Sequence, residues 1–348
     1  MIRHDDEAGS VGVQPMLRPL ALGHLRLPNR VVMAPLTRAR ATAADRAPNG
    51  LHAAYYGQRS SAGLIITEGA WVSERAIGFR GVPGIYSERQ IVAWRAVTNL
   101  VHALGGRIVL QLWHAGSAAP HELTVADIEQ VIRDFAAAAE RSSRAGFDGV
   151  EIAANGTYLI SRFLNARLNR RSDAYGRSRD RLLLEIVDAV SASWGQGCLG
   201  VRLSPYWTVA DRSGIEPWSG DYPYTADEKT LAAYDGLVAG LDGRPVTYLH
   251  LRGRAPAVPG AVPDFGELAR YRRLFAGPVI ANHGFNSESG NAVVEGGIAD
   301  AVSFARLFVA NPDLVSRFAL GHPLAVGDPS THYSGGARGY VDYPLWPA

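Results

Sequence analysis

Polar residues that could bind a ligand or assist a reaction stand at the ends of short apolar runs. Asn282-His283-Gly284 and Ala305-Arg306 follow the last two runs of the chain. Turns of this kind offer backbone N–H groups, and an arginine adds a bidentate contact, so both stretches predict a phosphate site. The residues that share this placement are Thr37, Glu68, Gln111, Trp113, His114, Asn155, Tyr158, Arg202, His250, Asn282, His283 and Arg306.

Each of these residues taken alone has a plainer explanation. Gln111 could satisfy polar groups inside a sheet. Arg202 could pair with Glu68 or Glu151, because a buried charge without a partner is costly. Their joint placement at strand ends is the stronger evidence, and it depends on the elements that would hold them.

Apolar runs predict eight buried strands over 30–34, 63–67, 107–111, 149–153, 199–203, 246–250, 278–281 and 301–304. Near-continuous apolar strands are typical of a parallel sheet that is covered on both faces. Helical periodicity lies between them, notably over 125–145, 179–193 and 287–296. This alternation indicates an α/β protein with a (β/α)8 TIM barrel, whose ligands bind where the strands end. An open doubly wound sheet is the runner-up, but no glycine-rich fingerprint follows Met33.

The N-terminal part of the chain precedes the first barrel strand. Residues 20–27 predict a β-hairpin that closes the barrel floor. We expect a flexible segment over 1–16 and a single barrel domain over 17–348, because no linker or short repeat interrupts the chain. With 348 residues, of which 47% are hydrophobic, the chain can bury one large core.

Composition narrows the class of protein. A net charge of +2 without a basic run argues against nucleic acid as a partner. No apolar window approaches the roughly 20 residues of a membrane span, and the first residues lack a signal core, so a cytoplasmic protein is expected. No metal site is predicted, because no His/Cys/Asp/Glu grouping has ligand spacing. Cys198, the single cysteine, is expected to be a small buried residue rather than a nucleophile.

Several ordered stretches resemble the Old Yellow Enzyme family of flavoproteins, from about Leu17 to Pro344. They are LPNRVVMAPLTR at 27–38, TEGA at 67–70, QLWH at 111–114, NRRSDAYG at 169–176, ANPDL at 310–314 and GYVDYP at 339–344. The resemblance implies a non-covalently bound FMN, NADPH or NADH as the reductant, and an ene-reductase type of activity on a small molecule. Family precedent also makes a homo-oligomer plausible.

The resemblance also implies roles for individual residues. Thr37 would touch the flavin O4–N5 edge, Gln111 its pyrimidine side, and Arg202 its N1 and O2 atoms. A fixed cation at that edge agrees with simple electrostatics, because it stabilises negative charge on the reduced flavin. The implied cofactor-binding residues are Pro35, Leu36, Thr37, Gly69, Gln111, Arg202, His283, Gly284, Ala305 and Arg306.

The substrate side departs from the family pattern. The family has His-x-x-Asn or His-x-x-His after the fourth strand, and alignment on Tyr158 puts Ala153 and Gly156 there. That pair grips a substrate carbonyl, and losing such donors can cost on the order of 10²–10³ in rate. Asn155 could replace one donor if the loop shifts. Tyr158 is retained as the implied proton donor, while Trp113, His250 and Tyr340 are expected to contact substrate.

A second departure is a deletion. Residues 117–121 lead almost directly from the QLWHAG stretch into the next helix, where the family has a long excursion over the active site. We therefore expect a shortened capping region. A missing lid should open the reactive face of the flavin to a bulky substrate, unless a partner subunit covers it.

Three functions remain open at this point. The first is NAD(P)H-driven reduction of an activated C=C in an unsaturated or oxygenated small molecule of specialised metabolism. The second is flavin-dependent dehydrogenation, or redox-neutral isomerisation or cyclisation, of a biosynthetic intermediate. The third is a flavin-binding barrel without ordinary ene-reductase catalysis, which the retained Thr37, Gln111, Arg202 and Arg306 argue against.

Overall fold

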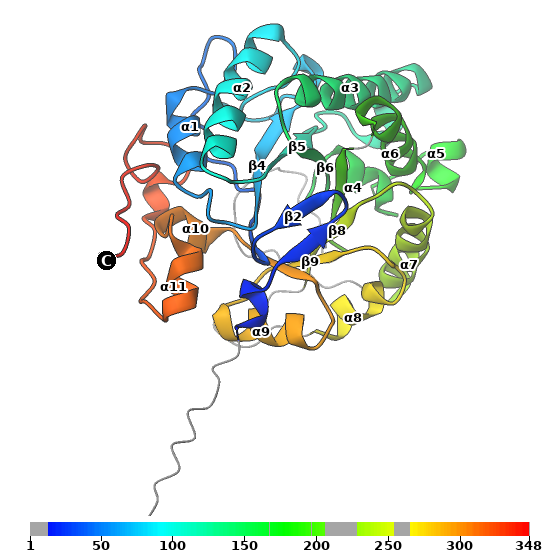
Figure 1. The fold of residues 1–348 in the computed structure, drawn as a ribbon. Coiled ribbons are helices and arrows are strands. Elements are labelled where there is room, and N and C mark those ends of the chain that lie inside the picture. The colour runs from blue at the N-terminus through cyan, green and yellow to red at the C-terminus, as the bar shows by residue number, and fades with distance from the viewer. Residues whose placement is uncertain (1–12, 167, 196, 206–227, 254–264, 348) are drawn as a thin grey trace, which may run out of the picture.

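A closed barrel of eight parallel strands forms the centre of the protein (Figure 1). It is seen in a computed structural model that describes residues 13–166, 168–195, 197–205, 228–253 and 265–347. Strand β10 pairs with both β9 and β3, which closes the sheet and excludes the open doubly wound alternative. The predicted TIM barrel is confirmed. Its strands are β3 (Val31–Met33), β4 (Leu64–Trp71), β5 (Ile108–Trp113), β6 (Gly149–Ala154), β7 (Cys198–Leu203), β8 (Tyr248–Arg252), β9 (Val279–Asn282) and β10 (Ala301–Phe304).

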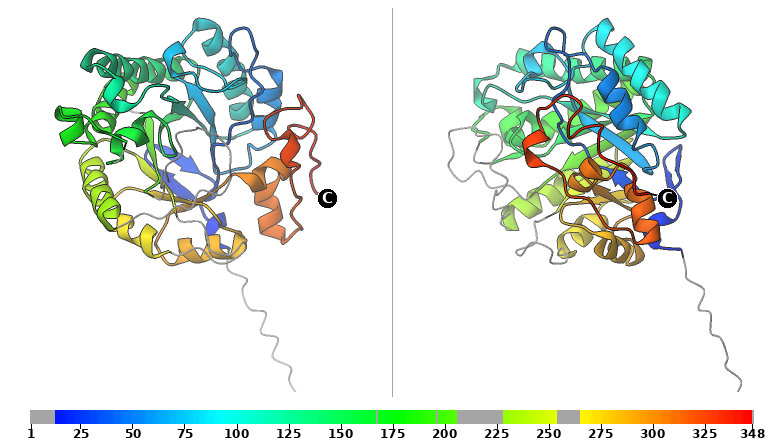
Figure 2. Two further views of the ribbon diagram at one scale, coloured as in Figure 1. Left: turned by 180° about the vertical axis from the view of Figure 1, so that it is seen from behind. Right: turned by 90° about the vertical axis from the view of Figure 1, so that its left-hand side faces the viewer.

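Helices form the outer layer around this barrel (Figure 2). The longest, α3, begins at a Thr124 side chain that accepts from the Asp127 backbone, and it buries Ile128, Val131 and Phe135 along one face, as its periodicity predicts. The helices are α1 (Gly50–Gly57), α2 (Glu88–Ala103), α3 (Val125–Arg144), α4 (Leu159–Leu164), α5 (Ala174–Arg177), α6 (Arg181–Trp194), α7 (Glu228–Asp242), α8 (Gly266–Arg272), α9 (Ser287–Glu295), α10 (Arg306–Ala310) and α11 (Leu314–Leu320). Short 3-10 turns are η1 (Pro15–Leu17), η2 (Glu74–Ala76), η3 (Pro120–Glu122) and η4 (Pro329–Thr331).

The predicted hairpin closes one end of the barrel. Strands β1 (Leu20–Leu22) and β2 (Leu25–Leu27) pair antiparallel, and their turn contains Gly23 at φ +59°. A Cβ at Gly23 would meet the Thr247 side chain at 2.8 Å, so the turn lies directly against the barrel. Leu22, Leu25 and Leu27 are buried in the same apolar cluster as inward-facing strand residues. With this end filled, the opposite mouth is where a ligand can enter.

Cys198 lies in the apolar cluster that the hairpin covers. Burial raises the pKa of its thiol to about 12, so the group stays protonated and unreactive at neutral pH. This agrees with the expectation of a small buried residue.

The packed chain begins earlier than the predicted boundary at residue 17. Met16 is fully buried against α9, and its backbone N–H donates to Asn291 Oδ1 at 2.9 Å. Gln14 Nε2 donates to the Phe318 carbonyl at 3.0 Å. Of the segment predicted to be flexible, 1–12 lies outside the described residues, and the single-domain division stays a prediction. No helix in the described parts of the chain is long and apolar enough to cross a membrane.

Candidate active site

A buried carboxylate organises polar groups inside the barrel. Glu151 Oε1 accepts a hydrogen bond from Gln111 Nε2 at 2.8 Å. Glu151 Oε2 accepts from His250 Nδ1 at 2.8 Å and from the Tyr248 hydroxyl at 3.2 Å. Since the Gln111 amide nitrogen is committed to Glu151, its carbonyl oxygen remains available to accept from a ligand N–H.

The charge state of this network follows from its surroundings. Burial acts to raise the pKa of Glu151, but His250, Arg202 and Gln111 outweigh it, so the net pKa is lowered and the carboxylate is ionised. Burial lowers the pKa of His250 despite the nearby carboxylate, so its ring is neutral. Glu151 was named in the sequence only as one possible partner of Arg202, and its position in the middle of β6 gave no sign of this organising role.

His250 does not line the substrate space, contrary to the expectation from sequence. Its ring is fully buried, and its second nitrogen, Nε2, lies 2.7 Å from Ser303 Oγ. Both ring nitrogens are therefore engaged within the barrel wall.

We expect the substitution Glu151→Gln to destabilise the fold by about 2–4 kcal/mol at neutral pH, because it removes a charge that accepts from three donors. A group whose folded pKa is depressed stabilises the fold above its unfolded pKa, and this contribution is lost as the pH falls through the folded value. The difference from wild type should therefore be constant near neutrality and shrink below the ordinary glutamate value of 4.5. Urea unfolding of both proteins across this pH range measures the difference in free energy of unfolding. A difference that grows in acid would contradict the conclusion that Glu151 is ionised.

Arg202 of β7 contacts the last residue of β9 and the segment that follows β3. It is 8% exposed, and its Nη2 donates to Asn282 Oδ1 at 2.9 Å. Its Nη1 donates to the Pro35 carbonyl at 3.4 Å, beside the segment that contains Leu36 and Thr37. Its charge helps to lower the pKa of Glu151, whereas Glu68 accepts from the loop after β3; the pairing of Arg202 with either carboxylate stays a prediction.

Glu68 and the C-terminal segment hold the loop that follows β3. Glu68 Oε2 accepts from the backbone N–H groups of Arg38 and Ala39 at 3.1 and 3.2 Å. From the other side, the Arg38 guanidinium donates to the carbonyls of His332 at 3.0 Å and Gly339 at 2.7 Å. These contacts set the position of the adjacent Thr37. Sequence reasoning quoted Arg38 within a motif but gave it no role.

Tyr340 belongs to this support and does not reach the substrate. It is fully buried, with its ring stacked on Tyr55 at a centroid distance of 4.1 Å. The guanidinium groups of Arg38 and Arg40 lie 5.0 and 4.7 Å from the same ring. The expectation that Tyr340 stacks on a substrate is therefore wrong, because the side chain is fully enclosed by protein groups.

Arginines of β7, β8 and α10 place positive charge near His283, in the loop after β9. This residue and Gly284 have φ of +91° and +80°. The pKa of His283 is lowered to about 4 by burial, with further contributions from Arg252, Arg306 and Arg202. Arg306 is exposed at the start of α10, next to Ala305. The sequence-predicted phosphate residues are thus brought together at one edge of the barrel mouth.

An aromatic stack lies where β4 and β5 end. Trp113 lies parallel to Trp71 at a centroid distance of 4.5 Å and to Phe79 at 5.4 Å. The Tyr158 ring meets Trp113 edge-on at 4.6 Å and 85°. Phe79 lies half-buried in the loop after β4.

The positions aligned with the family's carbonyl pair carry no donor side chain. Ala153 is the second-last residue of β6 and is 4% exposed. Gly156 has φ +72°, and a Cβ there would lie 2.9 Å from the Tyr158 ring. Asn155 lies half-buried between them. Tyr158 follows them, with its ring edge-on to Trp113.

The connection between β5 and α3 is short. After Trp113 it runs through Gly116, at φ +72°, and the single turn η3 to the Thr124 cap. His114 supports this turn, because its Nδ1 accepts from the Gly116 backbone N–H at 3.1 Å. No grouping of metal-ligand side chains occurs among the residues that the structure describes.

The model of the NADH:flavin oxidoreductase / NADH oxidase family matches residues 15–124 and 117–325. The chain belongs to this family. The match divides at the shortened connection after β5, which agrees with a deletion there. Rice (Oryza sativa subsp. japonica) 12-oxophytodienoate reductase 1 is 35% identical, covering 99% of this chain and 97% of the relative over 382 aligned positions. The alignment is longer than the 348 residues of this chain, so the relative has residues that this chain lacks.

Solved structures agree with the Old Yellow Enzyme assignment. Morphinone reductase in complex with tetrahydroNAD has a TM-score of 0.84 and 37% identity, covering 95% of this chain and 98% of that one. The Old Yellow Enzyme homologue of Zymomonas mobilis has a TM-score of 0.84 and 32% identity, covering 95% and 99%. This member of the Old Yellow Enzyme family is therefore an FMN-dependent oxidoreductase that uses a nicotinamide reductant.

Proposed function

We propose that the protein reduces an activated C=C bond in one bulky small molecule of specialised metabolism, with NADH or NADPH as the reductant. The observation that carries this proposal is the Tyr158 ring, held against Trp113 at 4.6 Å, beside positions 153 and 156 that have lost both carbonyl donors. A proton donor in place without the usual clamp fits a substrate that is held by its shape. Its polarising contacts then come from elsewhere in the site.

The residues present fit FMN. FMN, when bound, supplies hydride transfer between the nicotinamide and the substrate. The cationic region around His283 suits its phosphate, with backbone groups of Gly284 and Ala305 and the guanidinium of Arg306 as the proposed contacts. Pro35, Leu36, Thr37 and Gly69 would lie along the ring system. A Cβ at Gly69 would meet the Trp113 ring at 2.6 Å, so this position must stay small.

The fixed polar groups at the mouth have complementary roles in this proposal. Gln111 would accept from a ring N–H through the carbonyl that Glu151 leaves available. Arg202 would hold negative charge at the opposite pyrimidine edge, since its guanidinium is already oriented by Asn282. Tyr158 would deliver the proton that completes reduction. We propose a cytoplasmic location and leave self-association as an expectation from family precedent.

The first experiment is anaerobic mixing of the purified protein with NADH, and separately with NADPH, while the absorption of the oxidised flavin is followed. Rapid bleaching supports the reductive direction and leaves only the acceptor to be found. A yellow protein that neither nucleotide bleaches favours substrate dehydrogenation or redox-neutral isomerisation, which do not need the carbonyl clamp in the same form. A colourless protein that takes up no FMN would refute the proposal.

The phosphate contact gives a separate prediction. Replacing Arg306 with alanine should weaken FMN binding by about 10- to 100-fold, because a hydrogen bond to a charged group contributes about 1.5–3 kcal/mol. Riboflavin lacks the phosphate, so its affinity should be the same in the wild type and in this variant. Fluorescence titration of the apoprotein measures both ligands. Arg338→Ala, at an exposed arginine that pairs with Asp328, is the matched control. An equal loss for riboflavin would place Arg306 elsewhere.

A further inference from the structure

The shortened connection after β5 lies against the loop that carries Tyr158. The Leu159 backbone N–H donates to the His114 carbonyl at 3.3 Å. Gly116 has φ +72°, and a Cβ there would lie 2.9 Å from Leu159 Cα. The two segments therefore touch backbone to backbone, and a side chain at position 116 would push them apart.

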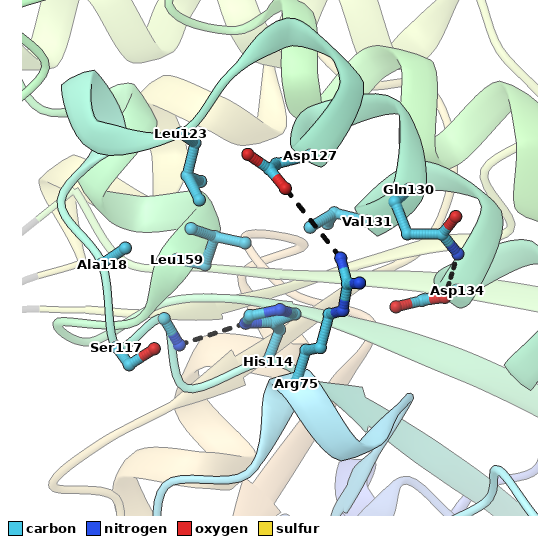
Figure 3. Close-up of a pocket in the computed structure, with 11 residues that line it drawn as sticks. Arg75, His114, Ser117, Ala118, Leu123, Asp127, Gln130, Val131, Asp134 and Leu159 are labelled. Carbon is cyan, nitrogen blue, oxygen red and sulfur yellow. Dashed lines mark hydrogen bonds and ion pairs between the residues drawn. The ribbon is translucent and has the colours of Figure 1, made fainter.

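A cavity of about 300 Å³ lies between α3 and this contact (Figure 3). Ala118 of the connection, Leu159 of α4 and Val131 of α3 all line it. Because this space is not filled by side chains, the connection lacks packing partners on that side. Hydrogen bonds therefore have a larger share in holding the connection in place.

Arg162 of α4 bridges the two segments. Its Nη1 donates to the Gly116 carbonyl at 2.6 Å and to the Ala118 carbonyl at 3.5 Å. Its Nε donates to the Thr157 carbonyl at 2.8 Å, and its backbone N–H donates to the Tyr158 carbonyl at 2.9 Å. One residue thus fastens the connection to Tyr158 and to the residue before it.

The guanidinium of Arg162 is committed to this bridge. It is half-buried, and among the described residues no carboxylate is in contact with it. Hydrogen bonds from a charged group are stronger than neutral ones, and the planar fork can serve two loops at once. The far end of the connection is fixed separately by Arg171, whose Nη1 donates to the Pro120 carbonyl at 2.6 Å.

The orientation of Tyr158 depends on the backbone that Arg162 holds. Tyr158 precedes α4, which has only six residues and no side-chain cap at Tyr158. Gly156, at φ +72°, stands two residues before it. Since neither neighbour is a long rigid element, the direction of the ring follows the position of residues 156–158.

We propose that Arg162 is a positioning residue for proton transfer from Tyr158. It joins the shortened connection to the Tyr158 loop, so the two segments move as one unit and the hydroxyl keeps its direction in the site. The bridge thereby supplies rigidity where the capping region is short. This inference rests on the proposed role of Tyr158 as the proton donor.

Hydrogen–deuterium exchange of the FMN-loaded protein tests the bridge without any substrate. In Arg162→Met we expect peptides that cover 114–119 and 156–162 to exchange about tenfold faster, because both segments lose hydrogen bonds to a charged group. Arg95→Met is the matched control, since that exposed arginine also donates to a backbone carbonyl, that of Arg144 at 2.7 Å. It should leave both segments unchanged. Faster exchange in only one segment, or in neither, would overturn the bridge.

A double-mutant cycle tests whether the bridge acts through Tyr158. The NADH-reduced protein is mixed anaerobically with trans-cinnamaldehyde or 2-cyclohexenone, whichever reacts faster, and stopped-flow absorbance gives the rate. We expect Arg162→Met to slow this step by about 10- to 100-fold, because a displacement of about 1 Å can cost that much, while reduction by NADH stays nearly unchanged. In the Tyr158→Phe background the same substitution should have almost no further effect, since the hydroxyl that it misdirects is gone.

The cycle separates failure of this inference from failure of the proposed function. If Tyr158→Phe alone reacts at the wild-type rate, the proposed proton donor is wrong and the inference falls with it. If Tyr158→Phe is slow but Arg162→Met is not, or if the two effects multiply, the proposed function stands and the positioning role is overturned.

A conservative variant separates a lost contact from a folding defect. Arg162→Lys keeps a charged donor but cannot span both loops, so it should recover part of the rate. Circular dichroism and FMN content should match wild type in every variant. If Arg162→Met fails to fold, Arg162→Lys takes its place in both experiments, and wild-type exchange and rate in it would overturn the proposal.

Discussion

Replacing Arg202 with methionine is expected to slow the reduction of bound FMN by NADH by about 10²- to 10³-fold. The guanidinium is held by Asn282 Oδ1 and the Pro35 carbonyl and is only 8% exposed, so its charge is fixed and poorly screened. Methionine keeps an unbranched apolar stem but removes the charge. Stopped-flow absorbance of the flavin under anaerobic conditions measures the rate.

The matched variant for this prediction is Arg202→Lys, which keeps the charge but loses the planar fork. It should recover part of the rate. Rates must be compared at equal FMN content, because weaker binding alone would lower the signal. A methionine variant that is reduced as fast as wild type would show that Arg202 does not act on the flavin.

The second large effect concerns Tyr158. The substitution Tyr158→Phe should lower turnover of the alkene substrate by about 10²- to 10⁴-fold, the usual contribution of a positioned acid. The ring and its edge-on contact with Trp113 are kept, so the shape of the pocket should not change. Steady-state consumption of NADH with a panel of α,β-unsaturated ketones and aldehydes measures the loss.

Bleaching of the flavin by NADH should remain fast in Tyr158→Phe, because this step needs no proton from the tyrosine. The combination of intact bleaching and lost turnover assigns Tyr158 to the second half of the reaction. If both rates fall together, Tyr158 serves nucleotide binding or structure, and if neither falls, another group provides the proton.

The barrel was predictable because its signal is local. Each apolar run matches a strand to within a few residues, for example 301–304 and β10 (Ala301–Phe304). Because parallel strands of a barrel end at the same mouth, the predicted strand ends were enough to place Gln111, Arg202 and His283 there. No side-chain contact had to be known.

The error at His250 arose from a shift of two residues. The sequence predicted a strand over 246–250, which would put His250 at the end, whereas β8 runs from Tyr248 to Arg252 and puts it in the middle. In a barrel this difference decides whether a side chain reaches the mouth or is buried in the wall. Apolar content cannot resolve it, because Val246, just before the strand, is apolar and buried as well.

Tyr340 and Glu151 were beyond sequence reasoning for another reason. Tyr340 is buried because two arginines from the loop after β3 reach carbonyls of a segment about three hundred residues away. Glu151 gains its role from three donors on β5 and β8. Contacts of this kind depend on long-range geometry, and a single sequence has no pattern that encodes them.

Gly156 has a consequence for how this pocket can change over evolutionary time. Its φ is +72°, and any side chain there would place Cβ 2.9 Å from the Tyr158 ring. Restoring a donor at this position by one mutation would therefore push the tyrosine from its seat on Trp113 before any substrate gained a contact. The loop and the tyrosine have become mutually dependent, so the route back to a two-donor clamp requires a change of backbone as well. This backbone constraint supports our proposal that the site selects its substrate by shape.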